Sequence, residues 1–142
     1  MHSLTRTLSR CAVGIVAALA CIVVAPGTPA HAAVPKCNGV GTIPNLKGGI
    51  LELPVYRTGS SESVRCGIYQ GDRGDDVNQL QWTLNYCYSE RLTTDGIFGA
   101  KTKAALVRAQ GREHISADGS YGPETALAIS HPQVNSGGCG KL

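Results

Sequence analysis

Few residues of this 142-residue chain have the types and spacing that acid–base, nucleophilic or metal chemistry requires. Beyond residue 32 the histidines are His114 and His131, whereas a catalytic zinc site takes three protein ligands and keeps one position open. His114 and Asp118 stand four residues apart, but Gly119 indicates that this segment is a turn and not a helix face. We therefore expect no metal, no cofactor and no catalytic residue, and we interpret His114 as a solvated loop histidine.

Two further catalytic arrangements are disfavoured. A cysteine nucleophile would leave one of the four cysteines beyond residue 32 without a partner. The ten acidic residues could supply a carboxylate pair for glycoside cleavage, but so short a chain has no room for a second lobe around a substrate cleft. We expect a protein that is not an enzyme, and a small hydrolase is the least favoured alternative.

The side chains best suited to contact a ligand are aromatic and cationic. Trp82 and Tyr86 stand four residues apart and point away from the apolar arc of their own segment. Exposed aromatic pairs stack on sugars or protein partners. The competing interpretation is that strands within residues 50–69 pack over them. We expect a groove formed by the loops around Tyr86–Arg91 and around Tyr121, with Arg91 and Arg108 available to ligand carboxylates.

One octet occurs twice, as DGIFGAKT at residues 95–102 and as DGSYGPET at residues 118–125. In each copy Asp can accept backbone hydrogen bonds, the first Gly can take a positive φ, the aromatic residue is an apolar plug, and Thr lies in the first turn of a following helix. One Asp per copy is too few oxygen ligands for a calcium loop. We interpret the octets as structural joints and not as catalytic motifs. The joint residues are Asp95, Gly96, Phe98, Gly99, Thr102, Asp118, Gly119, Tyr121, Gly122 and Thr125.

Three helices are predicted around these joints. A period of 3.6 predicts a first helix with Asp75 as its N-cap and with an apolar arc that ends at Tyr88. A second helix follows Gly99, and a third follows Gly122, with Pro123 at its first position. The predicted fold is mainly α, a three-helix bundle with a small N-terminal β-hairpin.

The hairpin is predicted from alternating apolar residues on both sides of the turn TGSSE, within residues 51–68. Pro54 assigns its strand to a sheet edge. The preceding segment KCNGVGTIPNLKGG is typical of irregular loop. The C-terminal NSGGCGKL is too rich in glycine for a regular element, so we expect a tail held down by Cys139.

The chain begins with features of a secretory signal peptide. Arg6 and Arg10 precede an apolar run over residues 11–25, and residues 30–32 form an Ala-x-Ala site. The run is shorter than the roughly 20 residues of a membrane span, and Ala18 is smaller than the aliphatic residue expected before a lipidated Cys21. We predict a secreted protein with no membrane contact after cleavage. Its parts are a signal peptide at 1–32, a loop and β-hairpin at 33–70, and a helical domain with a tethered tail at 71–142.

Four cysteines follow the predicted signal peptide: Cys37, Cys66, Cys87 and Cys139. An even number in an exported chain indicates two disulfides, and three pairings are possible. We favour Cys37–Cys66 with Cys87–Cys139, because each loop then stays within one half of the chain. The same residues 33–142 hold eleven Lys and Arg against ten Asp and Glu, a formal charge of +1. Such a balance provides no basic stripe for nucleic acid.

The segments GDRGDDVNQLQWTLN, LTTDGIFGAKTKAALVRAQ and ISADGSYGPET together resemble the peptidoglycan-binding domain of bacterial cell-wall proteins, over about residues 71–130. The resemblance implies a compact three-helix bundle. Ala109 departs from the pattern, since the family usually has Phe there. The positions that carry the resemblance are Gly74, Val77, Leu80, Gln81, Leu84, residues 95–99, Thr102 and Gln110.

The resemblance also implies a function, which is non-covalent binding of peptidoglycan through its glycan or its stem peptide. We expect a monomer at the cell wall or outside the cell, with Arg91 and Arg108 facing stem-peptide carboxylates. Members usually accompany a hydrolase domain, so a cell-wall hydrolase is a candidate partner. The alternative is a secreted interaction or inhibitor protein that reuses the bundle as a scaffold.

Overall fold

The computed structural model describes residues 33–142, so the predicted signal peptide at residues 1–32 lies outside the described residues. Three helices occur with a three-stranded antiparallel sheet and a two-stranded hairpin. The fold is mixed α/β, which corrects the expectation of a mainly helical protein. The elements are β1 (Gly39–Pro44), β2 (Ile50–Thr58), β3 (Ser61–Ser63), α1 (Asp75–Tyr88), α2 (Ala100–Arg112), α3 (Pro123–Ala128), β4 (His131–Pro132) and β5 (Cys139–Gly140). Within this range no helix combines the length and the apolar content that crossing a membrane requires.

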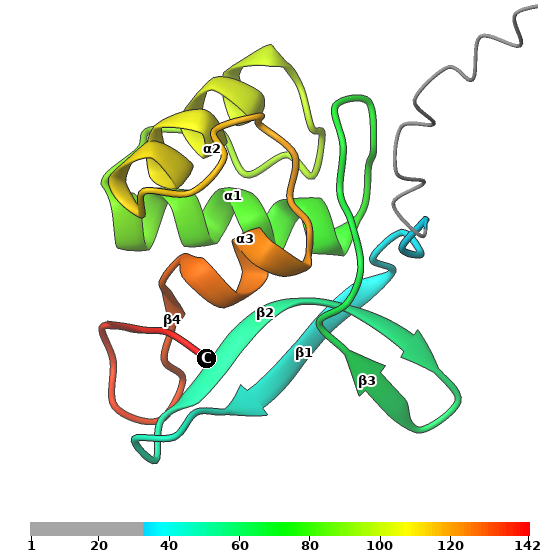
Figure 1. The fold of residues 1–142 in the computed structure, drawn as a ribbon, viewed down its shortest axis with the longest axis vertical. Coiled ribbons are helices and arrows are strands. Elements are labelled where there is room, and N and C mark those ends of the chain that lie inside the picture. Colours follow the sequence, from blue (N-terminus) through cyan, green and yellow to red (C-terminus); the bar gives the residue numbers. More distant parts are fainter. Residues whose placement is uncertain (1–32) are drawn as a thin grey trace, which may run out of the picture. The chain divides into compact units, whose positions relative to one another are not determined.

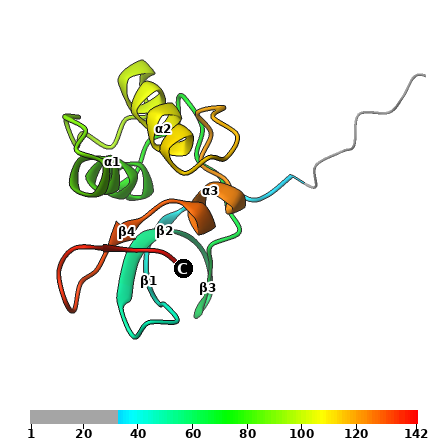
Figure 2. The same ribbon diagram turned by 60° about the vertical axis from the view of Figure 1, so that its left-hand side comes forward.

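The helices gather on one side of the described unit and the sheet on the other (Figures 1 and 2). α1 contacts both layers: Gln79 donates a hydrogen bond from Nε2 to the Glu52 carbonyl of β2 at 3.1 Å, while its apolar residues join the main core. That core includes Val77 of α1, Phe98 of the first octet and Leu106 of α2, none more than 1% exposed. α1 is therefore the element that positions the octets relative to the sheet.

The predicted helix starts are correct in place but not in every capping detail. α2 follows Gly99, and α3 follows Gly122 with Pro123 first, as expected. α1 has Gly74 as its N-cap, with φ at 150°, and Asp75 is already helical and makes no side-chain cap. This corrects the assignment of Asp75 as the N-cap. Glycine is required at position 74 because residues with a Cβ rarely adopt that conformation.

Residues 39–44 were expected to be loop, and that expectation is wrong. They form β1, which pairs with β2 in the register Gly39↔Val55 to Pro44↔Ile50. A Cβ on Gly41 would come within 2.8 Å of a Val55 methyl group. Here glycine marks a close approach of two strands and not a loop, and tertiary pairing overrides the low strand propensity.

Pro54 lies in the central strand of the sheet, not in an edge strand as predicted. The Val55 carbonyl accepts from Asn38 N–H of the segment leading into β1, at 3.0 Å. Since neighbouring residues of a strand alternate in direction, the Pro54 nitrogen faces the opposite side, where β3 pairs only from Tyr56 onward. The proline therefore removes no hydrogen bond between strands. On the side that its nitrogen faces, β2 has no paired strand at this position within residues 33–142, so Pro54 is locally at an edge.

The glycine-rich tail contains an element after all. β5 pairs with β4, and Val134 N–H donates to the Ile50 carbonyl at 2.9 Å. The tail is also held by the disulfide Cys87–Cys139, and the second disulfide is Cys37–Cys66, which is the favoured pairing. The prediction of an irregular tail failed because order here comes from long-range pairing.

Candidate functional site

The first octet is organised by one buried amide, that of Gln81, which is 1% exposed. Its Nε2 donates to Asp95 Oδ1 at 2.8 Å, to the Ile97 carbonyl at 3.0 Å and to Thr102 Oγ1 at 3.1 Å. Its Oε1 accepts from Gly96 N–H at 2.9 Å. The Asp95 carboxylate also accepts from Ile97 N–H at 2.9 Å. One side chain of α1 thus fixes the octet and the start of α2.

The second octet repeats this arrangement around Gln110 of α2. Its Nε2 donates to Asp118 Oδ1 at 3.2 Å, to the Ser120 carbonyl at 3.0 Å and to Thr125 Oγ1 at 3.0 Å. Its Oε1 accepts from Gly119 N–H at 2.9 Å. Asp, Gly and Thr of both octets therefore have the backbone and side-chain roles that the sequence predicts for structural joints.

The two glutamines are the residues that sequence reasoning missed. Each glutamine directly follows an apolar residue, in Leu80-Gln81 and in Ala109-Gln110, on the helix that precedes its octet. A glutamine on the apolar face of a helix needs partners for its buried amide. That requirement, together with the repeated octet, is the signal from which their role could have been inferred.

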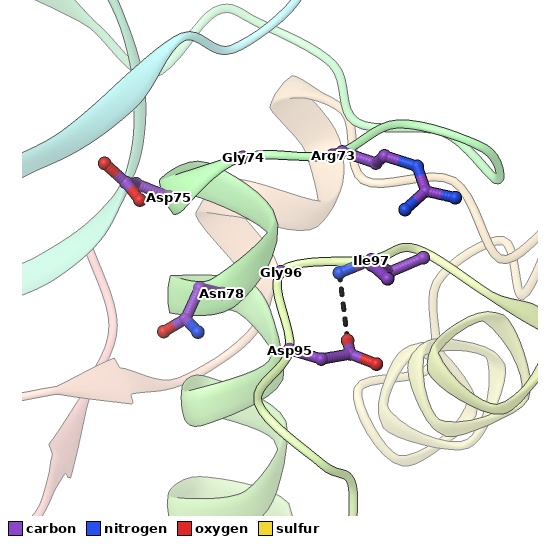
Figure 3. A pocket seen from close by; sticks show the side chains of 7 residues that line it. All are labelled: Arg73, Gly74, Asp75, Asn78, Asp95, Gly96 and Ile97. Carbon is purple, nitrogen blue, oxygen red and sulfur yellow. Dashed lines mark hydrogen bonds between the residues drawn. The ribbon is translucent and has the colours of Figure 1, made fainter.

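A hollow of about 350 Å³ opens beside the first octet. Figure 3 shows Gly74 and Gly96 at its centre, where bare backbone forms the floor. Asp75 and Asn78 project on one side of these glycines, and three side chains lie on the other. The complete lining is Arg73, Gly74, Asp75, Asn78, Asp95, Gly96 and Ile97.

Charge in the hollow is mixed. The amide of Gln81, the Ile97 N–H and the positive charge of Arg73 lower the pKa of Asp95, in that order, so its carboxylate is ionised at neutral pH. Arg73 forms no ion pair within the described residues. The Asn78 amide donates to the Thr94 carbonyl at 2.7 Å, which leaves its oxygen free to accept. The hollow therefore offers a cation, carboxylates and an amide oxygen to a polar ligand.

Two aromatic rings stand on the same exposed side of α1. Trp82 and Tyr86 stack with centroids 5.3 Å apart and planes 17° from parallel, and they are 45% and 47% exposed. Tyr86 Oη accepts from Gly138 N–H at 3.1 Å, so the tail restrains the second ring. Trp82 is one helical turn after Asn78, which places the aromatic pair next to the hollow.

Comparison with known proteins now places this region. Residues 73–129 match the family described as "Putative peptidoglycan binding domain". This segment is similar to that family. A crystal structure of a peptidoglycan-binding protein from Clostridioides difficile, in complex with glutamine hydroxamate, is similar with 27% sequence identity and a TM-score of 0.45. The match covers 61% of this chain and 53% of that one, so the chain spans about half the length of that protein.

The strands do not cover the aromatic pair in the described part of the chain. Leu51, Leu53 and Val55 of β2 instead form a second buried cluster, separate from the main core, with Val64 and other apolar residues. The expected alternative, that the hairpin packs over Trp82 and Tyr86, is therefore wrong. The physical reason is that the sheet buries its apolar side chains against its own loop and tail.

The remaining predicted contact residues are not brought together. Arg108 forms a two-point ion pair with Glu90, at 3.0 and 2.5 Å, so it is not free for a ligand carboxylate. Tyr121 is fully buried and packs edge-on against the His131 ring, so its assignment as a contact residue is also corrected. Arg91 is exposed and forms no ion pair in the described part of the chain.

His131 is buried, although the sequence marks its segment as tail-like. Its Nε2 donates to the Ala126 carbonyl at 2.8 Å, and burial lowers its pKa to about 4. His114 is exposed, as predicted. Neither histidine belongs to a group of three or more His, Cys, Asp or Glu side chains that could hold a metal, and residues 33–142 contain no such group. The aromatic pair and the hollow are thus the candidate site.

Proposed function

We propose that this protein is a secreted, non-catalytic peptidoglycan-binding protein that acts at the cell wall. The observation that carries the proposal is the match of residues 73–129 to the peptidoglycan binding domain family. The exposed aromatic pair supports it, because sugar rings stack on exposed aromatic faces. Two disulfides are typical of an extracytoplasmic protein.

The absence of turnover is part of the same proposal. The groups that hydrolytic chemistry would use are engaged elsewhere: the cysteines described here are in disulfides, and His131 is buried. Glu90 and Glu113 form ion pairs with Arg108 and Lys141. The hollow offers carboxylates but is shallow, and peptidoglycan would rest against it without being enclosed.

The test is co-sedimentation of the purified, oxidised protein with insoluble peptidoglycan, with soluble wall fragments measured in the same samples. We expect saturable pelleting and no release of fragments. Release of fragments above a buffer blank would contradict the non-catalytic role. If a folded protein with both disulfides did not pellet, the wall-binding function would be wrong, and the search would turn to protein partners.

The candidate site is tested by Trp82→Ala. We expect the variant to pellet with about five- to thirtyfold weaker affinity, since loss of one aromatic stacking surface removes on the order of 1–2 kcal/mol. Leu127→Ala is the matched control, because Leu127 is also an exposed apolar residue on a helix, 56% exposed on α3. Equal binding by both variants would remove the aromatic pair from the site.

A further inference from the structure

The two octets are held by the same hydrogen bonds, so the surroundings of the first octet can be compared with those of the second. From Gln81 to Gln110 the offset is 29 positions. The same offset relates Asn78 of α1 to Val107 of α2, and it relates Gly74, the N-cap of α1, to Lys103, which lies inside α2. The hydrogen bonds around the two glutamines are equivalent, so the residues that precede each glutamine can be compared as neighbours of its octet.

The second joint is covered by side chains. A Cβ on Gly119 would lie 2.6 Å from Cγ of Lys103, 2.9 Å from its Cε and 3.0 Å from a methyl group of Val107. The aliphatic part of Lys103 and the Val107 side chain therefore fill the space in front of this octet.

The first joint is open at the equivalent place. The atoms nearest to a Cβ on Gly96 would be the Gly74 carbonyl oxygen at 3.0 Å, its carbon at 3.7 Å, and Asn78 Cβ at 3.8 Å. No side chain of the described residues fills the space in front of Gly96 as Lys103 and Val107 do in front of Gly119, and the hollow of about 350 Å³ remains. The structural joint alone does not require this opening, since the second joint is built without it.

The residues around the opening also differ in kind between the two copies. Arg73 and Asp75 line the first hollow, and the positions 29 residues later are Thr102 and Ala104. Asn78 is replaced by Val107 in the same comparison. The first copy thus has a cation, a carboxylate and an amide around an open hollow, whereas Lys103 and Val107 fill the space in front of the second octet. Asp95, which is common to both copies as Asp118, adds a second carboxylate.

We infer that the hollow binds the peptide part of peptidoglycan, a short peptide that presents both a carboxylate and an ammonium group, while its attached amino sugar stacks on Trp82. Arg73 pairs with the ligand carboxylate, and Asp95, which lies on the same side of the two glycines, faces the ammonium group. The bare backbone of Gly74 and Gly96 lets the peptide approach closely. This inference rests on the proposed function and names the part of the wall that is recognised.

The experiment compares two soluble ligands of equal sugar length: glycan fragments that carry stem peptides, and the same fragments after enzymatic removal of the peptides. Calorimetry or fluorescence of Trp82 measures the affinity of the full oxidised protein for each. We expect the peptide-bearing fragment to bind about tenfold tighter. Arg73→Ala and Asn78→Val should each reduce that ratio to within about twofold.

The matched control is Lys103→Ala, which removes a cation at the equivalent place beside the second joint. We expect it to keep the full peptide preference. Arg73→Lys should keep part of it, because charge is retained but two-point pairing is lost.

Three results overturn the inference. The first is an unchanged preference in Arg73→Ala and Asn78→Val. The second is an equal loss of affinity for both ligands in these variants. The third is a wild-type protein that does not distinguish the two ligands. In each of these cases the wild-type protein still binds glycan and the proposed function stands, whereas binding of neither ligand would overturn the proposed function itself.

Discussion

At the scale of single residues, two buried glutamines determine how each helix of the domain is joined to the next. Gln81 and Gln110 each use both amide hydrogens and the amide oxygen inside the protein. Buried amides with all partners satisfied specify one arrangement, because any other leaves polar groups without hydrogen bonds. The octets are recognisable in sequence, but the side chain that holds each of them lies on the preceding helix.

Replacing either glutamine by alanine should destabilise the fold. Gln81→Ala leaves the buried Gly96 N–H without an acceptor, and Gln110→Ala does the same to Gly119. We expect the free energy of unfolding to fall by about 2–4 kcal/mol in each variant. Urea denaturation measures it. Gln70→Ala, at an exposed position, is the control and should change stability by less than about 0.5 kcal/mol.

His131 predicts an acid-sensitive contribution to stability. Its pKa falls from an ordinary 6.5 to about 4 in the folded protein because of burial. Between these values the unfolded chain binds a proton that the folded protein excludes, so stability is lost as pH falls from about 6.5 to about 4. The loss is about 3 kcal/mol, and it is absent above pH 7.

The measurement is the free energy of unfolding at pH 7 and at pH 4.5, compared between the wild type and His131→Gln. Asp72, Glu90 and Glu113 have lowered pKa values and also lose stabilising charge in acid, so the difference between the two proteins isolates the histidine. His114→Gln, at an exposed site, should behave as the wild type. An identical pH dependence in His131→Gln would contradict the prediction.

At the scale of elements, the open side of β2 is closed by three different parts of the chain. β3 pairs with it from Tyr56 to Thr58, Gln79 of α1 binds the Glu52 carbonyl, and Val134 of the tail binds the Ile50 carbonyl. Strand edges left unpaired invite association with other chains. The tail therefore has a structural role, and the disulfide Cys87–Cys139 keeps it in place.

Removing that disulfide should cost stability and loosen the tail. Cys87 and Cys139 are 52 residues apart, and the chain-entropy model gives about 4 kcal/mol for closing such a loop. We expect the variant with both cysteines changed to Ser to lose about this much in urea denaturation, and its residues 133–140 to exchange amide hydrogens faster. A loss below about 1 kcal/mol would show that pairing of the tail alone is sufficient.

At the scale of the whole molecule, residues 33–142 have eleven basic and ten acidic side chains. A formal charge of +1 provides little long-range attraction to an anionic surface, so affinity must come from short-range contacts at the site. The exposed aromatic pair, the hollow and the disulfide-held tail all meet along one side of α1.

This charge balance predicts how binding responds to salt. Affinity for peptide-free glycan should change by less than about twofold between roughly 50 and 500 mM NaCl, because stacking on Trp82 involves no ion pair. The additional affinity for peptide-bearing fragments should decrease over the same range, since Arg73 and Asp95 interact through charge. Equal salt dependence of both ligands would indicate nonspecific attraction.

The helical half of the molecule was largely predictable from sequence. Apolar residues at a period of 3.6 and glycines before each helix are local signals, so α1, α2 and α3 begin within one residue of their predicted positions. The exposure of Trp82 and Tyr86 away from the apolar arc follows from the same local geometry. The family could likewise be recognised, because its motif is a set of local spacings.

Other features were decided only by the tertiary structure, because they depend on contacts between residues that are far apart in the chain. β1 and β5 exist because of pairing partners, not because of strand propensity, and Pro54 lies in a central strand because β3 begins beyond it. Arg108 and Tyr121 are not part of the candidate site. Arg108 is paired with Glu90, and Tyr121 is buried in the core. The hollow is open because no side chain of residues 33–142 fills the space in front of Gly96, whereas Lys103 and Val107 fill it in front of Gly119, and that difference becomes visible only when both joints are seen in space. Local spacing determines which helices form, whereas burial and long-range hydrogen bonds determine which side chains remain free to bind.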